Sequence, residues 1–433
     1  MPANTLRVGI DFGTSSSALA FADPSGQVRF TQLSTLGVLA PSWRTLLFFD
    51  PEEQQNQRPI QFSAGGEAIA AYLECLGEGR LVQSFKTHLT TPSLGRTQIA
   101  HHAVGLEDMI AMFLLRLRER AEQHFGATIT AATIGRPVRF AGGRTPEEDT
   151  LAADRLLTAA RQAGFADARL ELEPVAAAYH YERTLTRPEL ALVADFGAGT
   201  TDFCLMRMGP TGHDGARSRD IIGTGGVGAA GDDLDAALLE HLVCPALGKG
   251  DTYREMGREH PIPGSYYYKL ARWHHLPFLG GARVRAELER LRRGARHPER
   301  IAALMHIIAT NSAFHLHKAV ERTKVLLSSR PRANFDFGDG EVEIHVAVTR
   351  RQFEQWIAPV TAAIATCLDD TLARAGVTAA EVDCVFMTGG TAFVPVVRAL
   401  FEARFGPAKL RSGDELLSIT SGLALRAAAP EPR

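Results

Sequence analysis

The sequence contains two copies of one short segment, IDFGTSSSAL at residues 10–19 and ADFGAGTTDF at residues 194–203. Their aspartates, Asp11 and Asp195, are 184 positions apart (195 minus 11), far more than the roughly 20 to 50 residues of a solenoid repeat. In each copy an apolar strand runs into a turn of Gly, Thr and Ser, and the aspartate stands at the end of that strand. The spacing and the shared pattern predict a chain built from a duplicated domain.

Periodicity predicts further elements around these two segments. Apolar residues recur at spacings of three and four from Leu106 to Leu117, which indicates a helix. The segment Thr145-Pro146-Glu147-Glu148 has the form of a capping box and indicates the start of another helix. We also expect strands at 132–138, 168–172 and 203–208, a helix at 173–185, and a strand, a Gly-Gly turn and a helix across 383–405. Mixed strands and helices of this kind indicate an α/β protein.

Composition and charge exclude several classes of protein. With 47 Lys plus Arg against 49 Asp plus Glu the net charge is −2, so we expect neither a nucleic acid nor an acidic membrane as partner. The five cysteines form no C-x-x-C pair, which argues against a disulfide framework or a zinc site. The N-terminus lacks the apolar run of a signal peptide, and no stretch reaches the ~18 apolar residues of a membrane-spanning helix. We therefore expect a cytoplasmic protein of about two to three domains.

Residues 245–310 differ from the rest of the chain in composition, with clustered aromatic residues and the arginine-rich run GARVRAELERLRRGARHPER. The arginines of this run alternate with Glu287, Glu289 and Glu299, which is typical of a solvated helix face. We interpret the region as an inserted helical subdomain. A docking surface is the alternative interpretation of its arginines.

The two Gly/Thr/Ser turns have the composition of a phosphate-binding site. Consecutive turn amides form a nest for anions, and glycine lets the backbone approach a phosphate closely. Asp11 and Asp195 would then lie beside the phosphates, where Mg²⁺ needs only one or two carboxylates because it keeps most of its waters. The Asp-Phe-Gly is not the protein-kinase motif, since the other kinase signatures are missing. The glycines at 223, 225 and 228 match only the letters of a dinucleotide fingerprint, because the acidic strand end expected about 20 positions later is missing and Cys244 lies in that region.

Seven segments together resemble, in sequence and order, the ATPase domain of the 70-kDa heat-shock chaperones (Hsp70), the DnaK type. They are VGIDFGTSSSALAF, TIGRPVRF, LELEPVAAAYHY, VADFGAGTTDF, AAGDDLD, AVERTKVLLSS and VFMTGGTAFVPVV. The resemblance covers nearly all of the chain and implies an α/β fold of the actin-like ATPase type, with duplicated ribonuclease H-like lobes and inserted subdomains. Lobe I would take residues 1–186 with an insertion at about 39–105, and lobe II residues 187–433 with a helical insertion at about 232–315. In size the chain is similar to the short, stand-alone, YegD-like members.

The resemblance implies roles for individual residues around bound ATP or ADP. Asp11 and Asp195 would hold a hydrated Mg²⁺, and Asp202 would lie near a potassium site. The catalytic set would be Lys86 beside the γ-phosphate, Glu173 and Thr200 near the attacking water, and the two metal-binding residues Asp11 and Asp195. The phosphates would lie against Gly13, Thr14, Ser15, Gly197, Ala198, Gly199 and Thr200. The nucleoside would contact Glu321, Lys324, Ser328 and Phe393, with the glycine loops at Gly231, Gly389, Gly390 and Thr391.

The sequence also departs from the family's pattern. Val325 and Phe393 occupy the positions where the chaperones place two arginines that sandwich adenine, which leaves the choice of base open. Ala198 replaces a phosphate-loop glycine, which is tolerable only if its φ is negative. The chain ends about forty residues after Thr391 without the family's peptide-gripping β-sandwich, so we expect no peptide-binding domain of its own.

These observations lead to one leading function and two alternatives. We expect an ATP-binding, slowly hydrolysing chaperone-like switch protein, partnered by a protein client or a separate effector protein. The first alternative is a small-molecule kinase of the sugar-kinase branch, which would need a carboxylate base in its cleft. The second is a filament-forming relative of actin.

Overall fold

The computed structural model describes residues 5–52, 60–75, 79–92, 95–99, 101–143, 145–182, 185–209, 220–310, 312–411 and 417–429. The chain forms two compact units. Unit 1 takes Met1–Ala230, Ala363–Ala392 and Val397–Arg433, and unit 2 takes Gly231–Ala362 and Phe393–Val396. The boundaries of these units differ from those of the two lobes that the sequence predicts, because unit 1 contains parts of both predicted lobes. The lobe boundaries stay a prediction.

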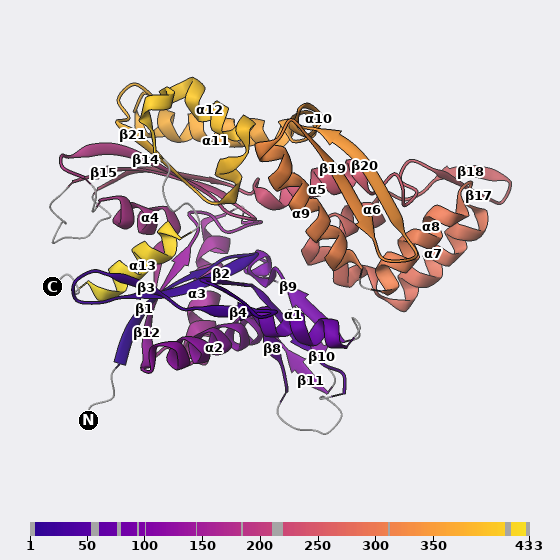
Figure 1. Ribbon diagram of the computed structural model, residues 1–433, viewed down its shortest axis with the longest axis horizontal. Coiled ribbons are helices and arrows are strands. Elements are labelled where there is room, and N and C mark those ends of the chain that lie inside the picture. The colour runs from indigo at the N-terminus through magenta and orange to yellow at the C-terminus, as the bar shows by residue number, and fades with distance from the viewer. Residues whose placement is uncertain are drawn as a thin grey trace. The chain divides into compact units, whose positions relative to one another are not determined.

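The first sheet of unit 1 has the strand order β13-β12-β1-β2-β3, and β6 pairs with β2 (Figure 1). Its strands are β1 (Thr5–Phe12), β2 (Ser16–Ala22), β3 (Val28–Phe30), β6 (Ser42–Arg44), β12 (Thr128–Arg136) and β13 (Asp167–Leu172). The first three strands form an antiparallel meander, whereas β12 runs parallel to β1 and β13 runs parallel to β12.

The second sheet of unit 1 has the order β16-β15-β14-β21-β22. Its strands are β14 (Glu189–Phe196), β15 (Thr201–Met208), β16 (Ile221–Val227), β21 (Cys384–Thr388) and β22 (Leu410–Arg411). Here too the first three strands form an antiparallel meander, and the last two continue the sheet in parallel. Asp11 lies opposite Ala18 in the first sheet, and Asp195 lies opposite Asp202 in the second. The repeated topology and register confirm the predicted duplication.

Two helices join the sheets through an unusually close contact. Helix α4 (Glu173–Glu182) follows β13 and packs on β14 and β15, while α13 (Ser418–Ala428) packs on β1, β2 and α4 (Figure 1). A Cβ built on Gly422 of α13 would lie 1.7 Å from the carbonyl oxygen of Ala176 in α4. A Cβ on Gly9 of β1 would lie 2.1 Å from the amide nitrogen of Ala424. Glycine is therefore required on both sides of α13, where backbone touches backbone.

The opposite face of the first sheet carries the main apolar core. Because side chains alternate along a strand, Val8, Ile10 and Phe12 point away from α13. They pack with the apolar stripe of α2 (Leu106–Phe125) and with α3 (Pro146–Gln162). The helix predicted from Leu106 is confirmed, and so is the capping box, in which Thr145 accepts the Glu148 amide at 3.3 Å.

The remaining elements of unit 1 are short. They are β4 (Leu33–Thr35), β5 (Val38–Ala40), β7 (Leu46–Phe49), β8 (Ser63–Ala64), α1 (Gly65–Glu74), β9 (Arg80–Gln83), the 3₁₀ helix η1 (Phe85–His88), β10 (Thr97–Ile99), β11 (His102–Val104) and η5 (Pro407–Lys409). The 3₁₀ helix η4 (Gly390–Phe393) and the helices α11 (Ala358–Ala375) and α12 (Pro395–Phe405) run from one unit into the other.

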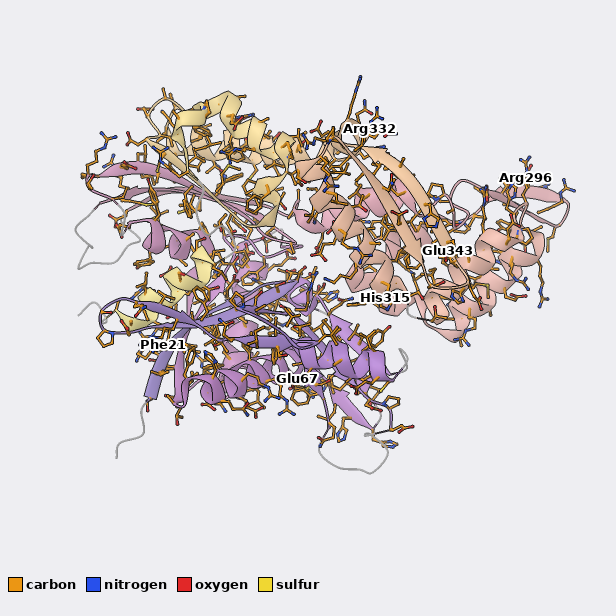
Figure 2. The ribbon with its side chains drawn as sticks, in the orientation of Figure 1. Phe21, Glu67, Arg296, His315, Arg332 and Glu343 are labelled. Carbon is orange, nitrogen blue, oxygen red and sulfur yellow. The ribbon has the colours of Figure 1, made fainter. Side chains whose placement is uncertain are left out.

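Unit 2 is mainly helical. It contains α5 (Gly231–Leu242), β17 (Thr252–Glu255), β18 (Arg258–Pro261), α6 (Ser265–Leu270), the 3₁₀ helix η3 (Trp273–Leu279), α7 (Ala282–Gly294), α8 (Pro298–Ala309), α9 (Ala313–Ser329), β19 (Arg332–Gly338), β20 (Glu343–Thr349) and α10 (Arg350–Trp356). Arg332 and Glu343 mark the β19–β20 hairpin in Figure 2. The helices predicted within 245–310 are present, together with the hairpin β17–β18, which the sequence did not predict. Among the described residues, no helix has the length and apolar composition needed to cross a bilayer.

Candidate phosphate and metal site

The two predicted turns have the same backbone geometry. In the first, the amide of Gly13 donates to the carbonyl oxygen of Ser16 at 3.1 Å. In the second, the amide of Gly197 donates to the carbonyl oxygen of Thr200 at 2.9 Å. A Cβ on Gly13 would lie 2.2 Å from the Ser16 carbonyl oxygen, so this turn requires glycine. Each sheet therefore ends its first hairpin in the same tight turn.

The structure brings these two turns together. A Cβ on Gly199 of the second turn would lie 3.5 Å from Oγ1 of Thr14 in the first turn. Residues 13–15 and 197–200 are half-buried, so a ligand could reach their backbone amides. The φ of Ala198 lies outside the left-handed region, which meets the condition that the sequence set for an alanine at this place. The two turns therefore lie next to each other within unit 1.

A lysine and a glutamate form a buried ion pair beside the turns. Nζ of Lys86 lies 2.8 Å from Oε1 of Glu173, and both residues are only 7% exposed. Lys86 is held in place by its neighbour in η1, because the Phe85 ring packs at 6.0 Å from the rings of Phe12 and Phe113. Phe12 follows Asp11 directly, so this aromatic cluster fixes η1 against the end of β1. Lys86 is thus a core residue, although its flanking sequence resembles the family's only weakly.

Three further carboxylates interact with this ion pair: Asp195 and Asp202 are buried, and Asp11 is half-buried. Burial, and next the charge of Glu173, raise the pKa of Asp11 to about 7, while Lys86 acts in the opposite direction. The same two causes raise the pKa of Asp202 to about 7. Burial and the repulsion of Glu173, Asp202 and Asp11 raise the pKa of Asp195 well above its usual value. Four carboxyl groups therefore share a single ammonium group, so the cluster has more acidic groups than positive charges.

The donor set fits a hydrated divalent cation. Among the described residues, no three His, Cys, Asp or Glu side chains are placed to ligate one metal ion directly. Mg²⁺ needs no such cage, because it is usually held by one or two carboxylates and its own waters. Oδ1 of Asp202 accepts the Arg139 amide at 3.2 Å, whereas its buried Oδ2 has no hydrogen-bond partner among the described residues. The Oδ2 atom of Asp202, unpartnered in a cluster with one ammonium group for four carboxyl groups, is what such a cation would satisfy.

The predicted Gly-Gly turn lies at the end of the second sheet, next to Asp195. Thr388 lies opposite Asp195 in the β14–β21 register. Gly389 has a φ of +87°, and its Cβ would lie 2.1 Å from the carbonyl oxygen of Phe196. Both the backbone conformation and the close approach require glycine here. Thr391 in the following 3₁₀ turn is buried.

The predicted nucleoside residues belong to unit 2. Gly231 is the first residue of α5, and Glu321, Lys324 and Ser328 follow one face of α9 at spacings of three and four. Nζ of Lys324 lies 2.8 Å from Oδ2 of Asp235 in α5, Glu321 pairs with Lys318 at 3.0 Å, and Ser328 donates to the carbonyl oxygen of Lys324. These contacts fix the α9 face within unit 2.

The side chains of Val325 and Phe393 are 61% and 53% exposed. They are among the few large apolar side chains that are exposed in the described part of the chain. An apolar surface is therefore present at both positions where the resemblance implies contact with the base.

Sequence reasoning missed two features of the site. The backbone amide of Arg139 holds Asp202, and its guanidinium pairs with Asp149 at 3.3 Å. Ser84, directly before η1, has a φ of +55°, a conformation that is strained for a residue with a Cβ. The GRPVRF segment that contains Arg139 was part of the resemblance, but nothing in the sequence marks Ser84.

Comparison with known proteins finds similarity over most of the chain. The family model described as Hsp70 protein matches residues 85–250 and 305–432. The chaperone protein DnaK of Thermosipho melanesiensis is 23% identical over 435 residues, which cover 97% of this chain and 59% of that protein. The chain thus spans less than two thirds of the length of this relative.

Proposed function

Because the chain belongs to the Hsp70 family and has its actin-like ATPase fold, we propose that it binds ATP and ADP with Mg²⁺ and slowly hydrolyses ATP as a chaperone-type switch. One observation carries this proposal: two glycine turns with the same hydrogen bond lie together beside a cluster of four carboxyl groups that has one ammonium group. The amides would bind phosphate oxygens, and the carboxylates would bind the cation that accompanies them.

Different residues of unit 1 would have different roles in phosphoryl transfer. The amides of Thr14 and Ser15 and those of residues 198–200 would position the phosphates, while Gly13 and Gly197 close the two turns with their own amides and leave room for the ligand. Lys86, oriented by its 2.8 Å contact with Glu173, would donate to an oxygen of the γ-phosphate. Glu173 and Thr200 would orient the attacking water, and the Glu173 carboxylate would accept its proton. When bound, Mg²⁺ would neutralise the charge of the phosphates. Positioning and charge stabilisation are most of what this reaction needs.

The nucleoside would bind to residues of unit 2. Glu321, Lys324 and Ser328 offer a carboxylate, an ammonium and a hydroxyl group to a ribose along α9. Val325 and Phe393 would offer apolar and aromatic surface to the base in place of two arginines. Stacking on an aromatic ring tolerates several bases, so we expect weaker discrimination between ATP and GTP than arginine contacts would give.

The remaining parts of the proposal concern the surroundings of the protein. We propose that it acts in the cytoplasm, that a potassium ion binds near Asp202, and that hydrolysis changes its affinity for a protein client or a separate effector. In these respects it would act like the short YegD-like members of the family.

Single-turnover hydrolysis of Mg·ATP by the full chain tests the proposal. We expect Asp11→Asn and Asp195→Asn to remove Mg-dependent hydrolysis while the circular dichroism spectrum stays that of the wild type. Asp23→Asn is the matched control: Asp23 lies in the exposed β2–β3 turn of the same unit, and an asparagine keeps its contacts with Ser25 and Gln27. Wild-type turnover in both cluster variants would refute the assignment. ATP turnover that depends on an added polyol would favour a small-molecule kinase instead.

A further inference from the structure

The arginines of α7 are largely neutralised within unit 2. Arg283 pairs with Glu287 at 3.1 Å, and Arg290 pairs with Glu255 of β17 at 3.0 Å. Arg292 and Arg293 share Glu289, at 2.8 and 3.5 Å. These pairs confirm the interpretation of a solvated helix face for most of the run, because each of these arginines forms an ion pair with a nearby glutamate.

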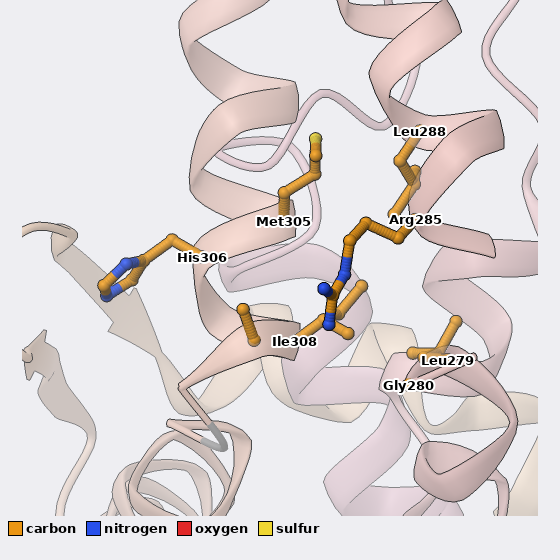
Figure 3. Close-up of a pocket in the computed structure, with 8 residues that line it drawn as sticks. Leu279, Gly280, Arg285, Leu288, Met305, His306 and Ile308 are labelled. Atoms are coloured by element: carbon orange, nitrogen blue, oxygen red, sulfur yellow. The ribbon is translucent and has the colours of Figure 1, made fainter. Parts of the chain in front are cut away.

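Arg285 is the exception. Among the described residues its guanidinium group has no ion-pair or hydrogen-bond partner, and it is the one arginine side chain of α7 of which this is true. Figure 3 shows that its side chain extends from α7 towards α8 and brings the guanidinium group next to Ile308. Arg285 is an exposed residue, and in this view its unpaired guanidinium group lies over apolar surface.

Arg285 lines a cavity of about 380 Å³ between η3, α7 and α8. The rest of its lining is mainly apolar, with Leu279, Leu288, Met305, Ile308 and Ala309 (Figure 3). Ligand pockets are typically apolar with a small number of placed polar groups, and this cavity has that composition. It lies wholly in unit 2, and none of its residues belongs to the proposed nucleotide site.

A second cation is missing from this lining. His306 also borders the cavity, but its ring turns away from Arg285 in Figure 3. Its Nε2 lies 3.0 Å from Oδ2 of Asp339 and its Nδ1 lies 3.1 Å from Oε2 of Glu341, so both ring nitrogens contact carboxylates on that side. The cavity therefore offers one unpaired positive charge and an apolar wall.

We propose that this cavity, defined by Leu279, Arg285, Leu288, Met305, Ile308 and Ala309, binds a small amphipathic monocarboxylate. The carboxylate would accept two parallel hydrogen bonds from the guanidinium group, which is the geometry that arginine offers best. The apolar tail would lie on the leucine, isoleucine and methionine side chains. A dianion such as a phosphate would keep one charge uncompensated.

The volume sets the size of the ligand. A group the size of a water molecule occupies ~30 Å³ in a liquid, so 380 Å³ holds about a dozen such groups. A carboxylic acid with roughly ten carbons fills this space. Decanoate is therefore the probe of choice, and decanamide is a probe of equal length without the charge.

Calorimetric titration and saturation-transfer NMR of the full chain with the two probes test the proposal. We expect decanoate to bind the wild type about tenfold or more tightly than decanamide does, because a charge-assisted pair replaces a neutral contact. Arg285→Gln should weaken decanoate by the same factor and leave decanamide unchanged. Ala309→Trp, at an exposed position of the lining, should block both probes.

Arg283→Gln is the matched control, since Arg283 lies on the same helix but outside the cavity, and it should bind decanoate as the wild type does. Equal binding of decanoate by the wild type and Arg285→Gln would overturn the proposal. So would binding of both probes with equal affinity, or no binding of decanoate at millimolar concentration. Binding through Arg285 of a peptide that ends in a leucine carboxylate, without binding of decanoate, would overturn the assignment to a small molecule.

Discussion

Removing one carboxylate from the buried cluster should make the protein more stable when no cation is present. Asp202 is the best choice, because it is 1% exposed and burial and the charge of Glu173 raise its pKa from 3.8 to about 7. In Asp202→Asn the amide oxygen can still accept the Arg139 amide, so the main change is the loss of a poorly solvated negative charge. Most substitutions of buried polar residues destabilise a protein, so a gain in stability is a distinctive result.

The pH dependence follows from the direction of the shift. A carboxyl group whose pKa is higher in the folded state binds its proton more tightly when folded. The wild type therefore loses stability as pH rises from about 4, the pKa in the unfolded chain, through about 7. The asparagine variant does not lose this stability, because asparagine does not ionise. The rise to about 7 corresponds to a gain of about 4 kcal/mol at pH 8, of which more than half develops between pH 5 and pH 8.

Urea denaturation followed by circular dichroism, in EDTA at pH 5 and pH 8, measures this gain. We expect Asp202→Asn to exceed the wild type at both pH values, and by more at pH 8. Asp23→Asn is the control: the hydrogen bond from Ser25 lowers the pKa of this exposed carboxyl, so its loss should bring no gain at pH 8. A variant that is less stable than the wild type at pH 8, or a difference that does not grow with pH, would refute the electrostatic argument.

Three further predictions concern other contacts. Lys86→Met should lower the free energy of unfolding by about 3 to 5 kcal/mol, because it leaves the Glu173 carboxylate buried without its ion pair. In urea denaturation, the double variant with Glu173→Gln should recover most of this loss. A Lys86→Met variant as stable as the wild type would contradict the prediction. Gly422→Ala should lower the free energy of unfolding by about 1 to 3 kcal/mol despite the better helix propensity of alanine, because its Cβ would lie 1.7 Å from a carbonyl oxygen of α4. Gly228→Ala, where no atom lies within 4 Å of the added Cβ, should be neutral, and equal losses in the two variants would argue against the close helix crossing. Val325→Arg should tighten Mg·ATP binding by a cation–π contribution of about 0.5 to 2 kcal/mol and leave inorganic triphosphate unchanged; equal effects on both ligands would show that the position does not contact the base.

Much of unit 1 could be predicted from the sequence, because its signals are local and occur twice. The paired Asp-Phe-Gly segments predicted both turns, and the structure confirms their shared geometry. The helix from Leu106 and the capping box at Thr145 likewise depend on short-range periodicity and hydrogen bonding, which a sequence records directly.

What the sequence could not supply depends on contacts between distant segments. The role of Gly422 follows from a crossing with α4, some 250 residues away in the chain. The burial of Lys86 follows from the packing of Phe85 on Phe12 and Phe113, not from its own flanking residues. Similarly, the arginines of α7 look alike in the sequence, and only the structure singles out Arg285 from its paired neighbours.

Calorimetric titration of the full chain with Mg·ATP, on the wild type and on Gly199→Val, tests the central claim most directly. A valine at this position should narrow the space between the two turns, because its Cβ would already lie 3.5 Å from Oγ1 of Thr14. We predict one binding site per chain in the wild type and a loss of about tenfold or more in affinity in the variant. Gly228→Val, made outside the turns, should bind as the wild type does. No binding of Mg·ATP by the wild type, or equal binding by wild type and Gly199→Val, would contradict the conclusion that the paired turns hold the phosphates.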